Sequence, residues 1–243
     1  MQLIRRHFVT IDSTNTWAKQ NVHLLPRDSM TVVTADAQTA GRGTFNRQWV
    51  SPYKQNIYAS FCFFLEKLQP DIGNIPQLLA LSIVRVLKIF QINARLKWPN
   101  DVLVSGKKIA GILTETVDYN GEVCVVVGVG LNVNMPLEIL GQIGNPATSL
   151  LVESGKEYDV ESVLSLLGKE FVSGLDLFFA NGFSPFVHAY REHFFVSPAQ
   201  MLHCRDGKIR CEGFFEGIDD RGALRLRLVD GTIKTLVAGE LNA

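Results

Sequence analysis

The sequence predicts an α+β fold, in which a larger domain of strands and helices is followed by a small β-barrel. Two runs, 31–35 and 57–65, are rich in β-branched or alternating apolar residues, which indicates sheet strands. Apolar residues at helical spacing over 76–90 indicate a core-facing helix. After Pro198, short alternating stretches are separated by glycines about every five to ten residues, a spacing typical of a barrel of roughly fifty residues.

Local signals predict the remaining elements. Residues 3–9 have the pattern of a short strand, and Asp12 or Ser13 can cap a helix that runs through Trp17 towards Leu24. An antiparallel meander of three strands is expected at 102–104, 108–116 and 122–131.

The carboxy-terminal half of the larger domain is expected to be helical. Asp159 can cap a long helix that reaches Phe178, and a shorter helix is expected over 185–194. A boundary near Val196 then separates domains 1–195 and 196–243.

Composition limits the functional classes. The chain has 243 residues, 47% of them apolar, which describes a soluble globular protein. Lys plus Arg and Asp plus Glu both number 24, so no bulk charge favours nucleic acid or a membrane. The amino terminus is too short and too polar for a signal sequence, and no uninterrupted apolar run is long enough to span a bilayer, so a cytoplasmic protein is expected. The cysteines form no C-x-x-C pair and are interpreted as buried or incidental thiols: Cys62, Cys124, Cys204 and Cys211.

The segment 39–51 is the first candidate for chemistry. It has few apolar residues and is expected to be a mobile loop. Its glycines free backbone N–H groups for an anion, Arg42 and Arg47 add charged donors, and Trp49 offers a face for a purine. This suits a nucleotide phosphate, although a solvated turn explains the composition equally well. The segment matches neither a Walker motif nor a dinucleotide fingerprint.

Three further segments carry weaker signals. In 97–101, Asp101 could help to hold Mg²⁺ beside phosphates. The simpler explanation of this segment is structural, with Trp98 in the core and Asn100-Asp101 in a turn. Lys108 has two interpretations: it binds a carboxylate at the mouth of a pocket, or it lies at the tip of a hairpin and serves only solubility. Gly111 leaves space for a ligand to lie against the backbone. In 128–134, two glycines and two asparagines suit the edge of a flat ligand, or simply a turn.

Together and in this order, these motifs resemble the biotin protein ligase family over nearly the whole chain. The matching segments are Ile11-Asp12-Ser13-Thr14-Asn15, Gln38 with Ala40-Gly41-Arg42-Gly43, Lys97-Trp98-Pro99-Asn100-Asp101, Lys108-Ile109-Ala110-Gly111-Ile112-Leu113, and the Gly-x-Gly-x-Asn of 128–132. The run 217–240 resembles the small SH3-like domain of that family. The resemblance implies a mixed β-sheet flanked by helices, similar to class II synthetase cores, followed by that barrel.

The resemblance also implies an activity. An ATP-dependent ligase of the monofunctional type would form biotinyl-5′-AMP from biotin and ATP with Mg²⁺, and would then transfer biotin to a lysine of a biotin carboxyl carrier protein domain. No nucleic acid or membrane partner is expected, and a homodimer is left open.

The resemblance assigns roles to particular residues. Those implied for biotin are Ser13, Thr14, Asn15, Gln38, Arg42, Gly43, Thr44, Lys108 and Gly111. Those implied for ATP are Arg42, Arg47, Trp49, Lys97, Asn100 and Asn132. Lys108, Arg42 and Asp101 would be catalytic, with Asp101 also a metal ligand. Arg42 and Lys108 would offset the repulsion between the biotin carboxylate and the α-phosphate of ATP.

One position departs from the family pattern. Many members have arginine where this chain has Thr44, so one guanidinium over the intermediate is lost. We hypothesise faster escape of the adenylate, unless Asn46 or another residue compensates.

Three alternatives are weighed against this function. A lipoate or octanoate ligase would need a longer apolar tunnel, and the segment 97–101 favours biotin. A biotin-sensing repressor would need a DNA-binding domain, which the ten residues before Ile11 cannot form. A catalytically dead binding module is disfavoured because Lys108 and Arg42 are both present.

Overall fold

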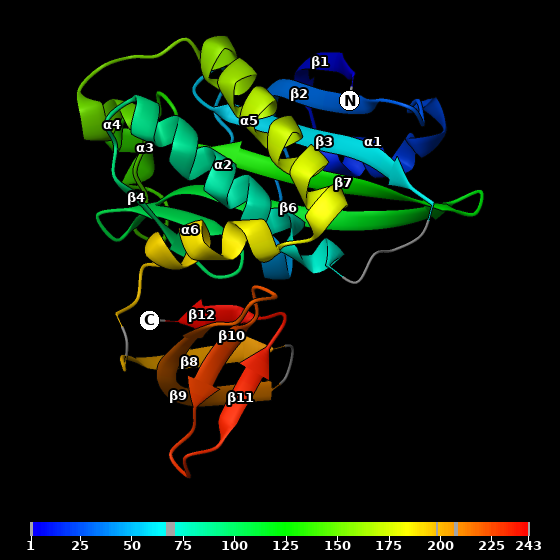
Figure 1. The fold of residues 1–243 in the computed structure, drawn as a ribbon. Helices are drawn as coiled ribbons and strands as arrows, with labels where there is room; N and C mark the ends of the chain where they lie inside the picture. Colours follow the sequence, from blue (N-terminus) through cyan, green and yellow to red (C-terminus); the bar gives the residue numbers. More distant parts are fainter. Residues whose placement is uncertain (1, 67–70, 198, 207–208, 243) are drawn as a thin grey trace.

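The chain forms two β-sheets in the computed structural model, which describes residues 2–66, 71–197, 199–206 and 209–242 (Figure 1). The strands of the larger sheet are β1 (Leu3–Ile11), β2 (Met30–Gln38), β3 (Ile57–Leu65), β4 (Ala94–Lys97), β5 (Asp101–Val104), β6 (Lys107–Tyr119) and β7 (Glu122–Leu131). Their order is β1-β2-β3-β7-β6-β5-β4, with β1 parallel to β2 and the other neighbours antiparallel. The predicted mixed sheet is confirmed.

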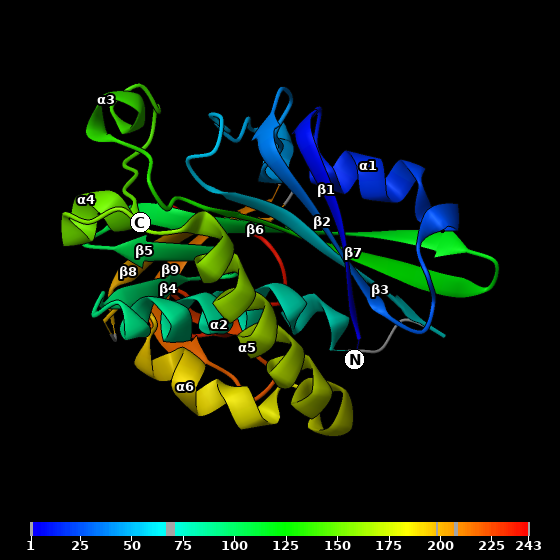
Figure 2. The same cartoon turned by 90° about the horizontal axis from the view of Figure 1, so that it is seen from above.

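Helices cover both faces of this sheet (Figure 2). Helix α1 (Thr14–Gln20) lies on one face, and α2 (Ile75–Ile89) and α5 (Val160–Asn181) lie on the other. Of the two proposed caps for α1, Ser13 is the residue used, because its side chain accepts a hydrogen bond from the N–H of Thr16. Asp159 caps α5 as predicted.

Short helical segments join the main elements. They are the α-helices α3 (Leu137–Leu140), α4 (Leu150–Ser154) and α6 (Val187–Glu192), and the 3₁₀ turns η1 (Val22–Leu24), η2 (Thr44–Asn46), η3 (Ile72–Asn74) and η4 (Ser184–Phe186). The single helix expected over 185–194 is therefore a 3₁₀ turn followed by a shorter helix.

The main hydrophobic core lies between the sheet and helices α2 and α5, where the rings of Phe61 and Phe171 pack edge to face with centroids 5.1 Å apart. Among the described residues, Ile72–Ile89 is the one helical segment long and apolar enough to cross a membrane by length and composition, and most of it is buried in this core. A smaller cluster around Ala18, Cys62 and Val126 lies under α1. All four cysteines are free, and three of them are buried. The α1 face therefore has less apolar packing, which leaves room there for polar side chains.

The prediction of three strands after α2 is wrong, because β4 precedes them and makes a meander of four. Ala94 and Leu96 are buried while Arg95 is exposed, so β4 has the alternation of a half-buried strand. Four residues are too few to show that period on their own, whereas the equally short β5 was predicted from the tight turn that follows it.

The carboxy-terminal strands form a separate five-stranded antiparallel sheet. They are β8 (Met201–Asp206), β9 (Ile209–Ile218), β10 (Leu224–Arg227), β11 (Ile233–Leu236) and β12 (Glu240–Asn242). The carbonyl of Gly222 in this unit accepts hydrogen bonds from Trp98 Nε1 at 3.1 Å and Gln77 Nε2 at 2.7 Å. Trp98 is therefore a buried link between the two sheets.

Candidate active site

Two cavities meet where β5, β6 and the segment 39–51 come together. The α1 cavity extends from the start of α1 to Lys108 and has a volume of about 40 Å³. The β12 cavity extends from Lys108 to Glu240 of β12 and has a volume of about 500 Å³. The residues that line both cavities are Gly43, Thr44, Trp49, Asp101 and Lys108.

The residues implied for the two substrates sort largely by cavity. All nine that the resemblance assigns to biotin line the α1 cavity. Of the six assigned to ATP, Arg47, Trp49, Lys97 and Asn132 line the β12 cavity. Arg42 and Asn100 line the α1 cavity and not the β12 cavity.

Glycines make the sheet surface under the α1 cavity flat. Gly130 lies opposite Gly111, and Gly128 lies opposite both Ser60 and Leu113. A β-carbon at Gly128 would lie 2.3 Å from Asn15 Oδ1, and one at Gly130 would lie 2.2 Å from the Trp49 ring. These glycines are needed because the side chains of Asn15 and Trp49 lie directly against the backbone.

Trp49 is half-buried and lines both cavities. Its ring lies against Gly130, and Lys108 Nζ is 5.4 Å from the ring centroid. Its Nε1 is buried without a hydrogen-bond partner in the described part of the chain. The cavity volume of about 40 Å³ has room for only a few water molecules, each of which needs roughly 10–15 Å³ on this measure, so a bicyclic ligand does not fit while Trp49 is in this position.

The segment 39–51 is folded over the site as a narrow loop. The N–H of Trp49 donates to the carbonyl of Gly41 at 2.9 Å, and the N–H of Gly43 donates to the carbonyl of Arg47 at 2.8 Å. Most of the segment is exposed or half-buried, as expected, but the half-buried ring of Trp49 packs against Gly130. Composition did not reveal that a single aromatic residue anchors the loop.

Apart from Arg42, uncharged hydrogen-bonding groups line the end of the α1 cavity away from Lys108. Gln38 Oε1 accepts a hydrogen bond from the N–H of Thr14 at 2.9 Å. Ser60 Oγ donates to Asn15 Oδ1 at 2.6 Å and lies 2.8 Å from Thr14 Oγ1. Sequence reasoning missed Ser60, a fully buried hydroxyl in the otherwise apolar strand β3. The one signal in the sequence was a serine in a strand whose other residues are apolar or aromatic.

Lys108 occupies the junction of the cavities rather than the hairpin tip. Its Nζ lies 2.6 Å from Asp101 Oδ1. A register shift in the β5–β6 pairing places Leu103 opposite Lys108 but Val102 opposite Ala110, and such bulges redirect side chains. The exposed lysine beside the turn is Lys107. The geometry therefore favours the pocket-mouth interpretation of Lys108.

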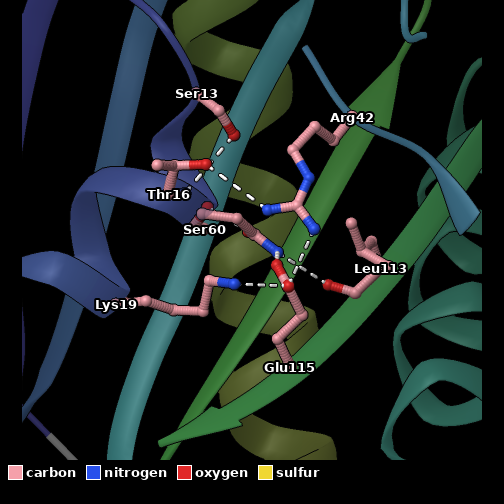
Figure 3. Close-up of polar contacts among 8 residues, drawn as sticks. Ser13, Thr16, Lys19, Arg42, Ser60, Leu113 and Glu115 are labelled. Carbon is pink, nitrogen blue, oxygen red and sulfur yellow. Dashed lines mark hydrogen bonds and ion pairs between the residues drawn. The ribbon is translucent and has the colours of Figure 1, made fainter. Parts of the chain in front are cut away.

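Arg42 is paired at the other end of the α1 cavity (Figure 3). Its Nη2 lies 3.0 Å from Glu115 Oε1, and its Nη1 lies 3.5 Å from Thr16 Oγ1. Glu115 is four residues beyond Gly111 along β6, a distance of about 13 Å at the rise of a strand. Arg42 and Lys108 line one cavity, but each is held by its own carboxylate.

Asn100 and Asn132 use their side-chain amides on the backbone. Asn100 Nδ2 donates to the carbonyl of Ile112 at 2.7 Å, and Asn132 Nδ2 donates to the carbonyl of Thr148 at 2.9 Å. Both bonds hold the cavity walls together.

The carboxy-terminal sheet reaches the β12 cavity through one carboxylate. Glu240 pairs with Arg47 of the loop over the site. Sequence reasoning missed Glu240, because nothing local indicates that β12 lies against a loop almost two hundred residues earlier.

The residues present fit a magnesium ion that arrives with a nucleotide better than one held by the protein alone. No group of three or more His, Cys, Asp or Glu side chains able to hold a metal occurs within the described residues. Mg²⁺ commonly binds through one or two carboxylates and the phosphates of a substrate. Asp101, which lines both cavities, can supply one carboxylate.

Two protein-family models match the chain. Residues 8–132 match the biotin/lipoate A/B protein ligase family, and residues 201–241 match the biotin protein ligase C terminal domain. The chain is 30% identical over 236 residues to the bifunctional ligase/repressor BirA of Escherichia coli (strain K12), covering 96% of this chain and 71% of BirA. It is 35% identical over 207 residues to a biotin–[acetyl-CoA-carboxylase] ligase of Paracoccus denitrificans, covering 80% of this chain and 83% of that protein.

A solved structure matches over the whole fold. The biotin protein ligase from Aquifex aeolicus in complex with biotin and ATP has a TM-score of 0.80 and 29% identity, covering 98% of this chain and 97% of that chain. The first family match includes every residue that lines the α1 cavity.

Proposed function

The chain belongs to the biotin/lipoate A/B protein ligase family, and from this premise we propose that it joins biotin to ATP as biotinyl-5′-AMP and then transfers biotin to a lysine of an acceptor protein. The observation that carries the proposal is the meeting of two cavities at Lys108 and Asp101. One cavity suits an uncharged ring with a tail, and the other, lined by Arg47 and Lys97, suits a nucleotide.

The polar end of the α1 cavity favours biotin over lipoate. A cyclic urea presents two N–H donors and one carbonyl acceptor. Gln38, Thr14 and Asn15 offer amide and hydroxyl groups that can pair with all three, without a charge. The dithiolane of lipoate would leave these buried polar groups without partners, which is costly. These polar groups therefore favour biotin, rather than lipoate, as the substrate of this family member.

The reaction brings two anions together, and the site supplies cations for them. A carboxylate oxygen of biotin attacks the α-phosphorus of ATP, the bond to the bridging oxygen breaks, and pyrophosphate leaves. Lys108 can exchange Asp101 for the carboxylate and the new acyl phosphate, which offsets their repulsion. A neutral lysine amine of the acceptor then attacks the acyl carbon, AMP leaves with the bonding electrons, and the amine loses a proton as the amide forms.

The nucleotide roles are proposed for the residues of the β12 cavity. Arg47 and Lys97 would bind phosphates, and Trp49 would stack on the purine after leaving its position on Gly130. Asp101 would hold Mg²⁺ together with the phosphates, and the ion would neutralise charge on the leaving pyrophosphate. Asn100 and Asn132 would shape the site through their backbone contacts.

The names of the related ligases support a biotin carboxyl carrier protein domain as the acceptor. Strand β6 pairs with β5 only up to Gly111, and Ile112 and Leu113 bond to Asn100 and Asn15, so the residues of β6 after Leu113 form an open sheet edge. Such an edge can pair with another strand, either from the acceptor or from a second copy of this chain.

We also propose that the catalytic domain ends at Phe195. Its N–H bonds to the carbonyl of Leu96 in β4, while the N–H of Ala199 bonds to the carbonyl of Phe215 in β9. The chain therefore passes from one sheet to the other between these two residues.

The direct test is to incubate the protein with ATP, Mg²⁺ and either biotin or lipoate, and to identify the acyl-adenylate by mass spectrometry. Biotinyl-5′-AMP should form and lipoyl-AMP should not. Formation of lipoyl-AMP alone would reverse the proposal.

A further inference from the structure

Glu115 joins its own strand, β6, to helix α1 and to the loop 39–51. Glu115 itself lines neither cavity. Its Oε1 lies 2.6 Å from Lys19 Nζ of α1 and 3.0 Å from Arg42 Nη2 of the loop. Its Oε2 accepts a hydrogen bond from Asn15 Nδ2 at 3.0 Å. Figure 3 shows the side chains of Lys19 and Arg42 converging on this carboxylate.

The carboxylate also determines which atom of Asn15 faces its surroundings. Asn15 Nδ2 donates to Glu115 and to the carbonyl of Leu113 at 3.1 Å, so both donors are directed to β6. Oδ1 is consequently directed to Ser60 and lies over Gly128. The amide therefore presents an acceptor, the atom that a urea N–H requires.

The charges around Glu115 keep it ionised. Burial opposes ionisation, but hydrogen bonds from Lys19 and Asn15 and the charges of Lys19 and Arg42 outweigh it, so the pKa of Glu115 is lowered. The carboxylate is thus available to all three partners at neutral pH.

We propose that Glu115 is a positioning residue for biotin: by holding Arg42 and Asn15 at once, it fixes the loop and the amide acceptor at the polar end of the α1 cavity. This inference rests on the proposed function. It assigns to Glu115 an effect on biotin binding and none on the nucleotide, because Asn15 and Arg42 line the α1 cavity alone and Lys19 lines neither cavity.

The test compares Glu115→Gln with the wild type in a pyrophosphate-release assay at varied biotin and varied ATP. The single oxygen of glutamine cannot serve Lys19, Arg42 and Asn15, and its amide would face their donors. We expect the KM for biotin to rise about tenfold or more, since charge-assisted bonds are lost, while the KM for ATP changes less than about twofold. Glu122→Gln, at another paired carboxylate of the same hairpin, is the control and should leave both constants unchanged.

A purely structural role predicts a different pattern. It would lower the melting temperature and shift both KM values together, and that result would overturn the proposal, as would an unchanged KM for biotin. If Glu115→Gln does not fold, Glu115→Asp keeps the charge but shortens its reach, and the same selective rise in KM for biotin is expected. Failure of the wild type to make biotinyl-5′-AMP would instead contradict the proposed function.

Discussion

Lys108 and Asp101 form an ion pair 2.6 Å long at the junction of the two cavities, while Arg42 is paired with Glu115 at the far end of one of them. The sequence pattern brought Arg42, Lys108 and Asp101 to attention, and all three line the α1 cavity. It did not reveal Ser60 or Glu115. Their roles depend on contacts with Asn15, which lies 45 and 100 positions away along the chain. Such long-range pairing leaves no local signal.

The first residue-scale prediction concerns Lys108. Lys108→Ala removes the cation at the meeting point of two anions, so the single-turnover rate of adenylate formation should fall about 100-fold or more. Lys107→Ala, at the neighbouring exposed lysine, is the matched control and should retain the wild-type rate. Equal rates for both variants would remove Lys108 from the mechanism.

The second concerns Thr44, which lines both cavities. Thr44→Arg should restore a charged donor over the acyl phosphate, worth about 1.5–3 kcal/mol, and should slow adenylate release roughly 10- to 100-fold. Release can be followed by chasing labelled biotinyl-5′-AMP with unlabelled ligand. Thr39→Arg, at an exposed residue of the same loop, is the control. Unchanged release from Thr44→Arg would show that this loop does not depend on a second guanidinium.

At the scale of elements, local patterns predicted the strands and long helices well, because hydrophobic period and capping residues are local properties. The positions of Ser13 and Asp159 mark the starts of α1 and α5. Strand β4 was missed because four residues do not establish a period, whereas the equally short β5 was predicted from the tight turn that follows it. The loop 39–51 buries little, as expected, but the packing of Trp49 against Gly130 could not be predicted, because the loop's own composition does not show which distant glycine it contacts.

The loop gives a prediction of its own. Because the Trp49 ring must move before a bicyclic ligand enters the α1 cavity, Trp49→Ala should increase the association rate of biotin measured without ATP. The same variant should raise the KM for ATP if Trp49 stacks on the purine. Trp17→Phe, in α1, serves as the control. An unchanged association rate for Trp49→Ala would mean that the ring is no obstacle.

At the scale of the whole molecule, two sheets that could be recognised separately in the sequence are joined by contacts that could not. Trp98 and Gln77 both bond to the carbonyl of Gly222, and Arg47 pairs with Glu240. The glycine spacing predicted the small carboxy-terminal domain, but its interface with the larger sheet depends on a few hydrogen bonds and ion pairs that form only after folding. The carboxy-terminal sheet thereby becomes part of the β12 cavity.

This interface can be tested by a pair of glycine substitutions. Gly222 and Gly231 both have positive φ values, +77° and +84°. A β-carbon at Gly222 would lie 2.4 Å from Asn74 Nδ2, whereas one at Gly231 would meet nothing within 4 Å. Gly231→Ala should cost about 1 kcal/mol of unfolding free energy, and Gly222→Ala about 1–3 kcal/mol more. Urea denaturation measures both, and equal costs would contradict the packed interface.

The central claim is that biotin and ATP react where the two cavities meet at Lys108. The most direct measurement is a crystal structure of the protein with biotinyl-5′-AMP. We predict the biotin ring among Asn15, Thr14 and Gln38, the acyl phosphate at Lys108 Nζ, and Trp49 displaced from Gly130. An adenylate bound elsewhere, with Lys108 still paired to Asp101 and Trp49 still on Gly130, would contradict it.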